Sequence, residues 1–331
     1  MKMTKDQPMT TSETQPAAPA RSRRRFNPAD AVLPALIVLL AAGVGIAEPK
    51  FLTGSNLANL GSQIAPLLIV SVGQAFAIIG GGLDLSIAAV MSVAGVVGIL
   101  AVPSLGIVGG VLVMALVGLA VGLVSGAIIA YMRTSPLIVT LGMASVAQAI
   151  ALILANGVPI YSVPPELTDA IGFGAVYGIP ASDLIAAGVL IFAAVILRGT
   201  TLGRYIYAIG SNRAAALKSG VNVPFHTMLI YGLSGLTAGI AAIVLTAWVG
   251  AAQPTAEPGI TLESIAAVVL GGIALTGGSG GMIHVIYGVL ILGMLSNAMN
   301  MLGISSYFQI LAVGIVIIIA VVLDRLRRKE S

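Results

Sequence analysis

The sequence predicts an all-α membrane protein with about ten transmembrane helices, and two observations carry this prediction. Only 8% of the 331 residues are charged, whereas a soluble domain carries about 25%, and the mean hydropathy is +1.06. The apolar residues also gather in about ten segments, most of them close to the roughly 17–25 residues that a membrane-spanning helix needs. These segments are residues 31–47, 57–79, 87–102, 106–130, 136–155, 183–197, 226–249, 262–276, 282–301 and 306–323.

The charged residues predict that both termini lie in the cytoplasm. Basic residues concentrate in the cytoplasmic loops of membrane proteins. An even number of spans with the N-terminus inside puts every basic residue between the spans on that side, except Lys50. Eight spans remain an alternative if some glycine-rich segments only re-enter the membrane. The residues expected inside are Arg133, Arg198, Arg204, Arg213 and Lys218, and the acidic residues expected outside are Glu48, Glu166, Asp169, Asp183 and Glu257.

Both ends of the chain are predicted to be basic cytoplasmic tails. Residues 1–30 are rich in Pro, Ser, Thr and Gln, lack apolar periodicity and are expected to be disordered. The arginine-rich stretch 21–25 followed by 31–47 is similar to a signal peptide. However, the apolar run is long enough to span the membrane and further spans follow, so an uncleaved first helix is expected. Residues 31–323 then form a single transmembrane domain, and 324–331 form the second tail.

Two longer loops interrupt the apolar segments. The outer loop, 156–182, contains four prolines and is expected to form a small periplasmic cap. The inner loop, 199–224, is expected to contain a short helix, because Asn212 can cap its N-terminus and Gly220 can supply a left-handed stop. A helix of about two turns does not persist alone in water. We therefore interpret it as a docking element, held by the membrane body or by a partner in the cytoplasm.

A glycine-rich motif, residues 80–86, separates two of the apolar segments. Its glycines break the helix, and Asp84 or Ser86 can cap the helix that follows. Asp84 is the only acidic residue between Glu48 and Glu166. An ionisable residue near membrane depth is by default a candidate functional residue. Helix capping is the alternative, and it is the interpretation favoured here.

The sequence offers no recognisable site for catalysis, metal or cofactor. The glycines of 271–281 are followed by Met282 and Ile283, where a phosphate-binding loop needs Lys and then Ser or Thr. The chain has no cysteine, and His226 and His284 lack metal-ligand spacing. No catalytic triad can be assembled at membrane depth. Basic ends in so apolar a chain indicate cytoplasmic flanks and no nucleic-acid partner. We therefore expect neither an enzyme nor a cofactor.

Several amides lie at the depth of the predicted spans. Such groups need partners in a low-dielectric medium, and they can form hydrogen bonds between helices. Alternatively, they can line a polar path for a hydroxyl-rich solute. Trp248 is the only tryptophan and aromatic residues total 5%, which favours a conduit over a tight sugar-binding site. The candidate pathway-lining residues are Gln74, Asp84, Ser86, Gln148, Asn297 and Asn300.

Six stretches in order resemble permease subunits of ribose-type ABC sugar importers, and the resemblance runs from about residue 32 to 323. The matching stretches are FLTGSNLANL (51–60), GGLDLS (81–86), TTLGRYIYAIGSNRAAALKSGVNV (200–223), AQPTAEPG (252–259), LESIAAVVLGG (262–272) and LGISSYFQ (302–309). The chain departs from the family pattern at Ile87-Ala88-Ala89, at Ile273-Ala274, and at Glu263, where the family commonly has Asp. These departures leave the identity of the sugar open.

The resemblance implies a subunit of the bacterial inner membrane that imports a monosaccharide, ribose or a related pentose or hexose, by alternating access. It implies a fold akin to cobalamin-type importers and a dimer with a second copy or a paralogue. It also implies a cytoplasmic ATPase cassette that hydrolyses ATP and a periplasmic sugar-binding protein. The residues that the resemblance places against the cassette are Gly203, Arg204, Gly210, Asn212, Arg213, Ala215, Leu217 and Gly220.

Three other functions are weighed against this one. Within the same class, the solute is a branched-chain amino acid or a nucleoside. An ion-coupled secondary carrier needs buried ionisable groups as coupling sites, and Asp84 is nearly alone in that role. A membrane scaffold that transports nothing is the third.

Overall fold

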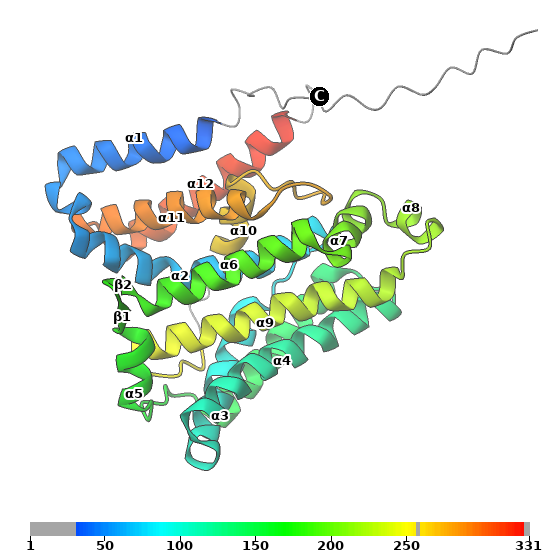
Figure 1. Ribbon diagram of the computed structural model, residues 1–331, viewed down its shortest axis with the longest axis horizontal. Helices are drawn as coiled ribbons and strands as arrows, with labels where there is room; N and C mark the ends of the chain where they lie inside the picture. The colour runs from blue at the N-terminus through cyan, green and yellow to red at the C-terminus, as the bar shows by residue number, and fades with distance from the viewer. Residues whose placement is uncertain (1–30, 256–258, 328–331) are drawn as a thin grey trace, which may run out of the picture.

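The computed structural model describes residues 31–255 and 259–327, and in this part of the chain it is a bundle of helices (Figure 1). Among the described residues, six helices are long and apolar enough to cross a membrane. The predicted all-α membrane protein is thus confirmed, apart from one short hairpin. The predicted tail 1–30, the last four residues of the C-terminal tail and Glu257 lie outside the described residues. The six helices are α2 (Gly54–Ile79), α3 (Ile87–Tyr131), α4 (Pro136–Leu154), α6 (Ala181–Gly199), α9 (Val223–Val249) and α11 (Met282–Met301).

The remaining elements are three further apolar helices and several short connecting elements. The other apolar helices are α1 (Val32–Ala47), α10 (Gly259–Leu270) and α12 (Ser306–Arg327). The connecting elements are η2 (Pro49–Leu52), α5 (Pro165–Leu167), η3 (Thr168–Gly172), α7 (Thr201–Ser211), α8 (Arg213–Lys218) and the antiparallel strands β1 (Ala175–Val176) and β2 (Ile179–Pro180).

Helix α3 joins two predicted segments into one 45-residue element with a sharp kink. Gly106 has φ 71° and ψ 176°, which is not helical, and Pro103 precedes it in the helix. The two arms fold back on each other, because a Cβ on Gly110 would lie 2.8 Å from the carbonyl oxygen of Gly98. The predicted segments 87–102 and 106–130 are therefore its two arms.

The core of the bundle is built on close contacts between α3 and α9. A Cβ on Gly118 would lie 2.3 Å from the carbonyl oxygen of Gly235, and one on Gly122 would lie 2.2 Å from that of Tyr231. No side chain fits at these positions, so the two backbones approach as closely as small residues allow. Helix α2 packs against this pair, and most of its residues from Ile64 onward are buried.

The loop between α10 and α11 corrects one predicted segment. The sequence predicts an apolar segment over 262–276, but α10 ends at Leu270 and residues 271–281 form a loop. The helix does not extend further because Gly272, Gly277 and Gly278 all have positive φ angles, which are incompatible with a right-handed helix. This loop lies where the chain turns from α10 into α11.

The two polar loops lie at opposite ends of the bundle (Figure 1). Residues 156–182 form α5, η3 and the β1–β2 hairpin, whereas 199–224 form α7 and α8. The predicted short helix is confirmed as α8: the Asn212 side chain accepts a hydrogen bond from the Ala215 backbone N–H at 2.9 Å, and Gly220 has φ 83°. Helix α7, directly before it, was not predicted as a separate element.

Candidate functional site

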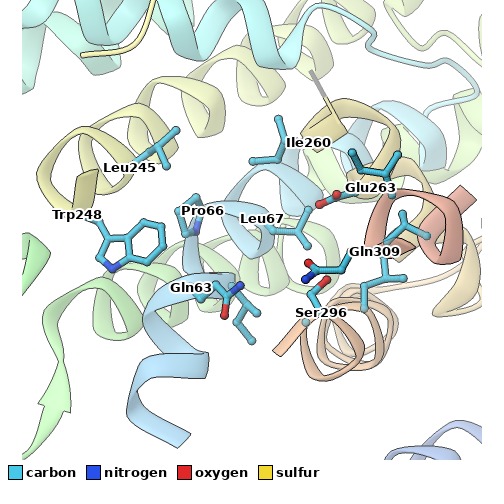
Figure 2. A pocket seen from close by; sticks show the side chains of 14 residues that line it. Gln63, Pro66, Leu67, Leu245, Trp248, Ile260, Glu263, Ser296 and Gln309 are labelled. Carbon is cyan, nitrogen blue, oxygen red and sulfur yellow. The ribbon is translucent and has the colours of Figure 1, made fainter. Parts of the chain in front are cut away.

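A cavity of about 280 Å³, hereafter the central cavity, lies between α2, α9, α10, α11 and α12 (Figure 2). Most of its wall is apolar, with four polar side chains and one indole ring. Small-molecule sites commonly combine an apolar wall with a few polar groups in this way. The polar and aromatic lining residues are Gln63, Glu263, Ser296, Gln309 and Trp248, and the apolar ones include Ile64, Pro66, Leu67, Leu245, Ile260, Leu292, Ile310 and Val313.

Pro66 shapes the part of α2 that faces this cavity. It lies inside the helix and has no N–H, so the carbonyl of Ser62 loses the donor that a regular α-helix would give it. Gln63 lies in the same turn and is half-buried. On the other side, a Cβ on Gly293 would lie 2.2 Å from Cγ2 of Ile64, so α11 closes tightly against α2.

The side-chain amide of Gln309 on α12 is held by hydrogen bonds near the end of α11. The Gln309 side-chain amide donates to Oδ1 of Asn300 at 2.7 Å and to the carbonyl of Ile304 at 3.2 Å. Figure 2 shows Gln309, Ser296 and Glu263 gathered on one side of the cavity, with Trp248 on the other. Neutral amide and hydroxyl groups with one carboxylate suit a small solute that carries hydroxyl groups.

None of the six predicted pathway residues is among those that line this cavity, and their pathway role stays a prediction. Asn297 exchanges two hydrogen bonds with Asn56 of α2, at 3.0 and 3.3 Å. Gln148 donates to the carbonyl of Pro254, which follows α9. Gln74 is fully buried, and neither polar atom of its amide has a hydrogen-bond partner among the described residues.

Asp84 is buried at the start of α3 and accepts three hydrogen bonds. Its Oδ1 accepts from the backbone N–H of Ser86 at 3.0 Å and from the Ser86 hydroxyl at 2.6 Å. Its Oδ2 accepts from the hydroxyl of Ser234 in α9 at 2.7 Å. Thr261 of α10 completes the arrangement, because its hydroxyl oxygen accepts from the N–H of Ala88 at 3.2 Å. Ser86 is the residue just before α3, and it makes no side-chain capping hydrogen bond to that helix. Asp84 therefore does not cap the N–H groups of α3 itself, and its carboxylate ties the start of α3 to α9.

The residues expected to face an ATPase cassette divide into two groups. Gly203 and Gly210 pack against the bundle: a Cβ on Gly210 would lie 1.8 Å from the carbonyl oxygen of Ile79. The exposed group is on α8, where 61% of Leu217 is accessible while its neighbour Ala216 is buried. Arg204, Asn212, Arg213, Ala215 and Gly220 are exposed as well.

Helix α7 is also tied to the loop that precedes α11. The Tyr207 hydroxyl donates to the carbonyl of Gly280 at 2.8 Å, and the Gly278 N–H donates to the carbonyl of Ile79 at 2.8 Å. Ser211 donates to the carbonyl of Gly278 at 3.4 Å. These contacts connect α8, through α7, to the ends of the two helices α2 and α11 that line the cavity.

Six membrane-length helices among the described residues, with a partly polar cavity between α2, α9, α10, α11 and α12, are typical of a multi-pass membrane transport protein. The chain belongs to the family described as branched-chain amino acid transport system / permease component, whose model matches residues 56–321. It is therefore a permease subunit of the bacterial inner membrane and not an enzyme, as predicted.

Curated relatives share most of the chain with this protein. It is 39% identical over 295 residues to the ribose import permease protein of Escherichia coli, covering 88% of this chain and 91% of the relative. It is 34% identical over 304 residues to the D-allose transport system permease protein of Escherichia coli, covering 89% and 91%. For the L-arabinose transport system permease protein of the same organism the identity is 36%, covering 89% and 90%. The resemblance to ribose-type permeases is thus confirmed. No solved structure matches the chain.

Proposed function

We propose that this protein is the membrane permease subunit of an ATP-driven importer that moves a monosaccharide, ribose or a related pentose or hexose, from the periplasm to the cytoplasm. The observation that carries the proposal is the 34–39% identity, over most of the chain, to permeases for ribose, D-allose and L-arabinose. The amides of Gln63 and Gln309 and the hydroxyl of Ser296 in the central cavity suit the hydroxyl groups of such a solute.

The cavity favours a sugar over a branched-chain amino acid, the solute in the family description. An amino acid carries a carboxylate, which needs a cationic or strongly donating partner when it leaves water. No lysine, arginine or histidine is among the residues that line the cavity, and Glu263 suits the ammonium group of an amino acid but not its carboxylate. The ion-coupled carrier is disfavoured because Asp84, the candidate coupling group, is already held by Ser86 and Ser234.

We propose ten membrane crossings with both termini in the cytoplasm. The two arms of α3, the other five membrane-length helices and the apolar helices α1, α10 and α12 support this number. The charges support the orientation: Arg204, Arg213 and Lys218 lie in α7 and α8, whereas Glu166 and Asp169 lie in the cap at the other end. The cobalamin-type relationship, implied by the sequence resemblance, belongs to this proposal as well.

The cytoplasmic end, with α7 and α8, and the periplasmic end, with the cap, each have a proposed partner. The exposed face of α8 docks the cytoplasmic ATPase cassette, and the cap end receives the periplasmic sugar-binding protein. A second copy of the permease, or a paralogue, completes the membrane unit. Movement of the cassette passes from α8 through α7 to the ends of α2 and α11, which switches the cavity between outward-open and inward-open states.

Uptake by cells tests this function. Cells that lack their own ribose, arabinose and allose importers receive the permease together with the candidate cassette and binding protein of its source organism. We expect uptake of at least one labelled monosaccharide that requires the cassette and survives an uncoupler. Uptake of labelled leucine with no monosaccharide uptake, or uptake that stops with the uncoupler while ATP is maintained, would contradict the proposal.

A further inference from the structure

A second cavity, of about 350 Å³, lies between the outer part of α2 and the cap. It shares two lining residues, Gln63 and Trp248, with the central cavity. These two side chains therefore stand where the two cavities meet, and Figure 2 shows both at the same side of the central one. The lining of the second cavity, hereafter the outer cavity, is Ala58, Asn59, Ser62, Gln63, Gly172, Phe173, Gly174, Ala175, Gly178, Pro180 and Trp248.

The backbone around Trp248 is held from three sides. A Cβ on Gly172 of the cap would lie 2.3 Å from the carbonyl oxygen of Ala247 and 3.2 Å from Cα of Trp248, so the cap rests directly on the end of α9. Gly250, with φ 72°, ends α9 in a left-handed turn. The next residues are fixed by paired hydrogen bonds between Ile160 and Ala252, at 3.0 and 2.9 Å. The indole is therefore anchored at its backbone, while 36% of the residue stays exposed.

The outer cavity carries no formal charge. None of its lining residues is acidic, basic or histidine, and its polar side chains are the amides of Asn59 and Gln63 and the hydroxyl of Ser62. Amides both donate and accept hydrogen bonds, which matches hydroxyl groups, and the face of an aromatic ring suits the C–H face of a sugar ring. A charged solute would lose water there without an opposite charge to replace it.

We propose that Trp248, with Asn59 and Gln63, forms a monosaccharide-binding subsite in the outer cavity, through which the solute passes before it reaches the central cavity. This inference rests on the proposed function, because it takes the solute to be a sugar. The indole stacks on the sugar ring, Asn59 binds its hydroxyl groups from the outer cavity, and Gln63 contacts the solute from either cavity. The single tryptophan of a chain poor in aromatic residues thus marks one defined point on the import route.

Because Trp248 is the only tryptophan, its fluorescence reports this subsite directly. The full-length permease is reconstituted in liposomes and titrated with D-ribose, L-arabinose and D-allose, with leucine as the zwitterionic control. We expect a saturable change in emission with at least one sugar and none with leucine. In the Asn59→Ala variant, the concentration for half-saturation should rise about fivefold, the loss of roughly one hydrogen bond.

Transport by the complete importer supplies the second arm. At sugar concentrations well below saturation, Trp248→Ala should lower the rate of sugar uptake about tenfold. Trp248→Phe should keep most of the wild-type uptake rate, because a phenyl ring retains part of the stacking surface. Tyr161→Ala, an exposed aromatic of the outer loop that does not line the outer cavity, is the control and should transport normally. Each variant is compared at equal amounts of assembled complex in the membrane.

The two arms separate failure of this inference from failure of the proposed function. If the wild-type complex imports a monosaccharide but the emission of Trp248 does not respond to it and Trp248→Ala transports normally, the subsite is refuted and the proposed function stands. An equal emission change with leucine refutes the selectivity of the subsite for a neutral sugar. If the wild-type complex imports no monosaccharide, the proposed function fails, and the subsite fails with it.

Discussion

Gly210 of α7 lies so close to Ile79 at the end of α2 that a Cβ on the glycine would be 1.8 Å from the isoleucine carbonyl oxygen. The same Cβ would be 2.6 Å from the backbone nitrogen of Gly278, in the loop before α11. Three segments that are far apart in sequence therefore meet backbone to backbone at one point. In the proposed transporter, this point joins the cytoplasmic docking helix to two of the helices around the central cavity.

Replacing Gly210 with alanine should separate α7 from α2 and weaken the link between ATP hydrolysis and import. The added methyl group collides with backbone atoms, which cannot move aside like the end of a flexible side chain, and overpacking of this kind costs about 1–3 kcal/mol. We expect a lower thermal unfolding midpoint and fewer sugars imported per ATP hydrolysed by the reconstituted complex. The control is Gly142→Ala in α4, because nothing lies within 4 Å of a Cβ there. Unchanged coupling in Gly210→Ala would contradict the proposed route.

Removing the carboxylate of Asp84 should destabilise the protein. In Asp84→Ala, the backbone N–H of Ser86 and the hydroxyls of Ser86 and Ser234 lose a buried acceptor, at a cost of about 2–5 kcal/mol. Ser234→Ala removes only one of these hydrogen bonds and should cost less. Thermal unfolding of the purified permease in detergent measures both effects.

The double variant Asp84→Ala/Ser234→Ala completes a mutant cycle. We expect it to be less destabilised than the sum of the two single variants, because it leaves no Ser234 hydroxyl without its acceptor. Strictly additive effects would show that the hydrogen bond between Asp84 and Ser234 makes no net contribution to stability.

Replacing Gln74 with leucine should stabilise the protein. Both polar atoms of this fully buried amide lack a hydrogen-bond partner among the described residues, and an unpartnered buried polar group costs about 1–3 kcal/mol. An apolar side chain of similar size removes that cost, so the thermal midpoint should rise. Uptake by the same variant tests the sequence-based pathway prediction: unchanged transport would show that the solute does not depend on Gln74.

The sequence predicts the helices well because their lengths are set by the membrane. The apolar segments 57–79 and 282–301 nearly coincide with α2 and α11. In lipid, an apolar segment satisfies its backbone hydrogen-bonding groups by forming a helix. Helix α8 is predictable for a local reason, because Asn212 and Gly220 supply its cap and its stop within a few residues.

The candidate site is less predictable because it depends on which helix faces converge. Gln63 and Trp248 lie on α2 and α9, and only the packing of these helices with the cap brings both side chains to the same two cavities. Asp84 and Ser234 are 150 residues apart, and no local pattern pairs them. The amides that the sequence suggests as pathway residues include Asn297, which instead exchanges hydrogen bonds with Asn56.

A separate ATPase drives the proposed importer through α8, and a single substitution tests this central claim. Leu217→Asp puts a charge on the exposed face of α8, and Leu302→Asp does the same at a comparably exposed leucine after α11, with 61% and 51% of the two residues accessible. Co-purification of the cassette with the tagged permease is measured for both variants at equal membrane levels. We predict that Leu217→Asp loses the cassette and that Leu302→Asp retains it. Full retention of the cassette by Leu217→Asp, together with normal sugar uptake, would contradict the account.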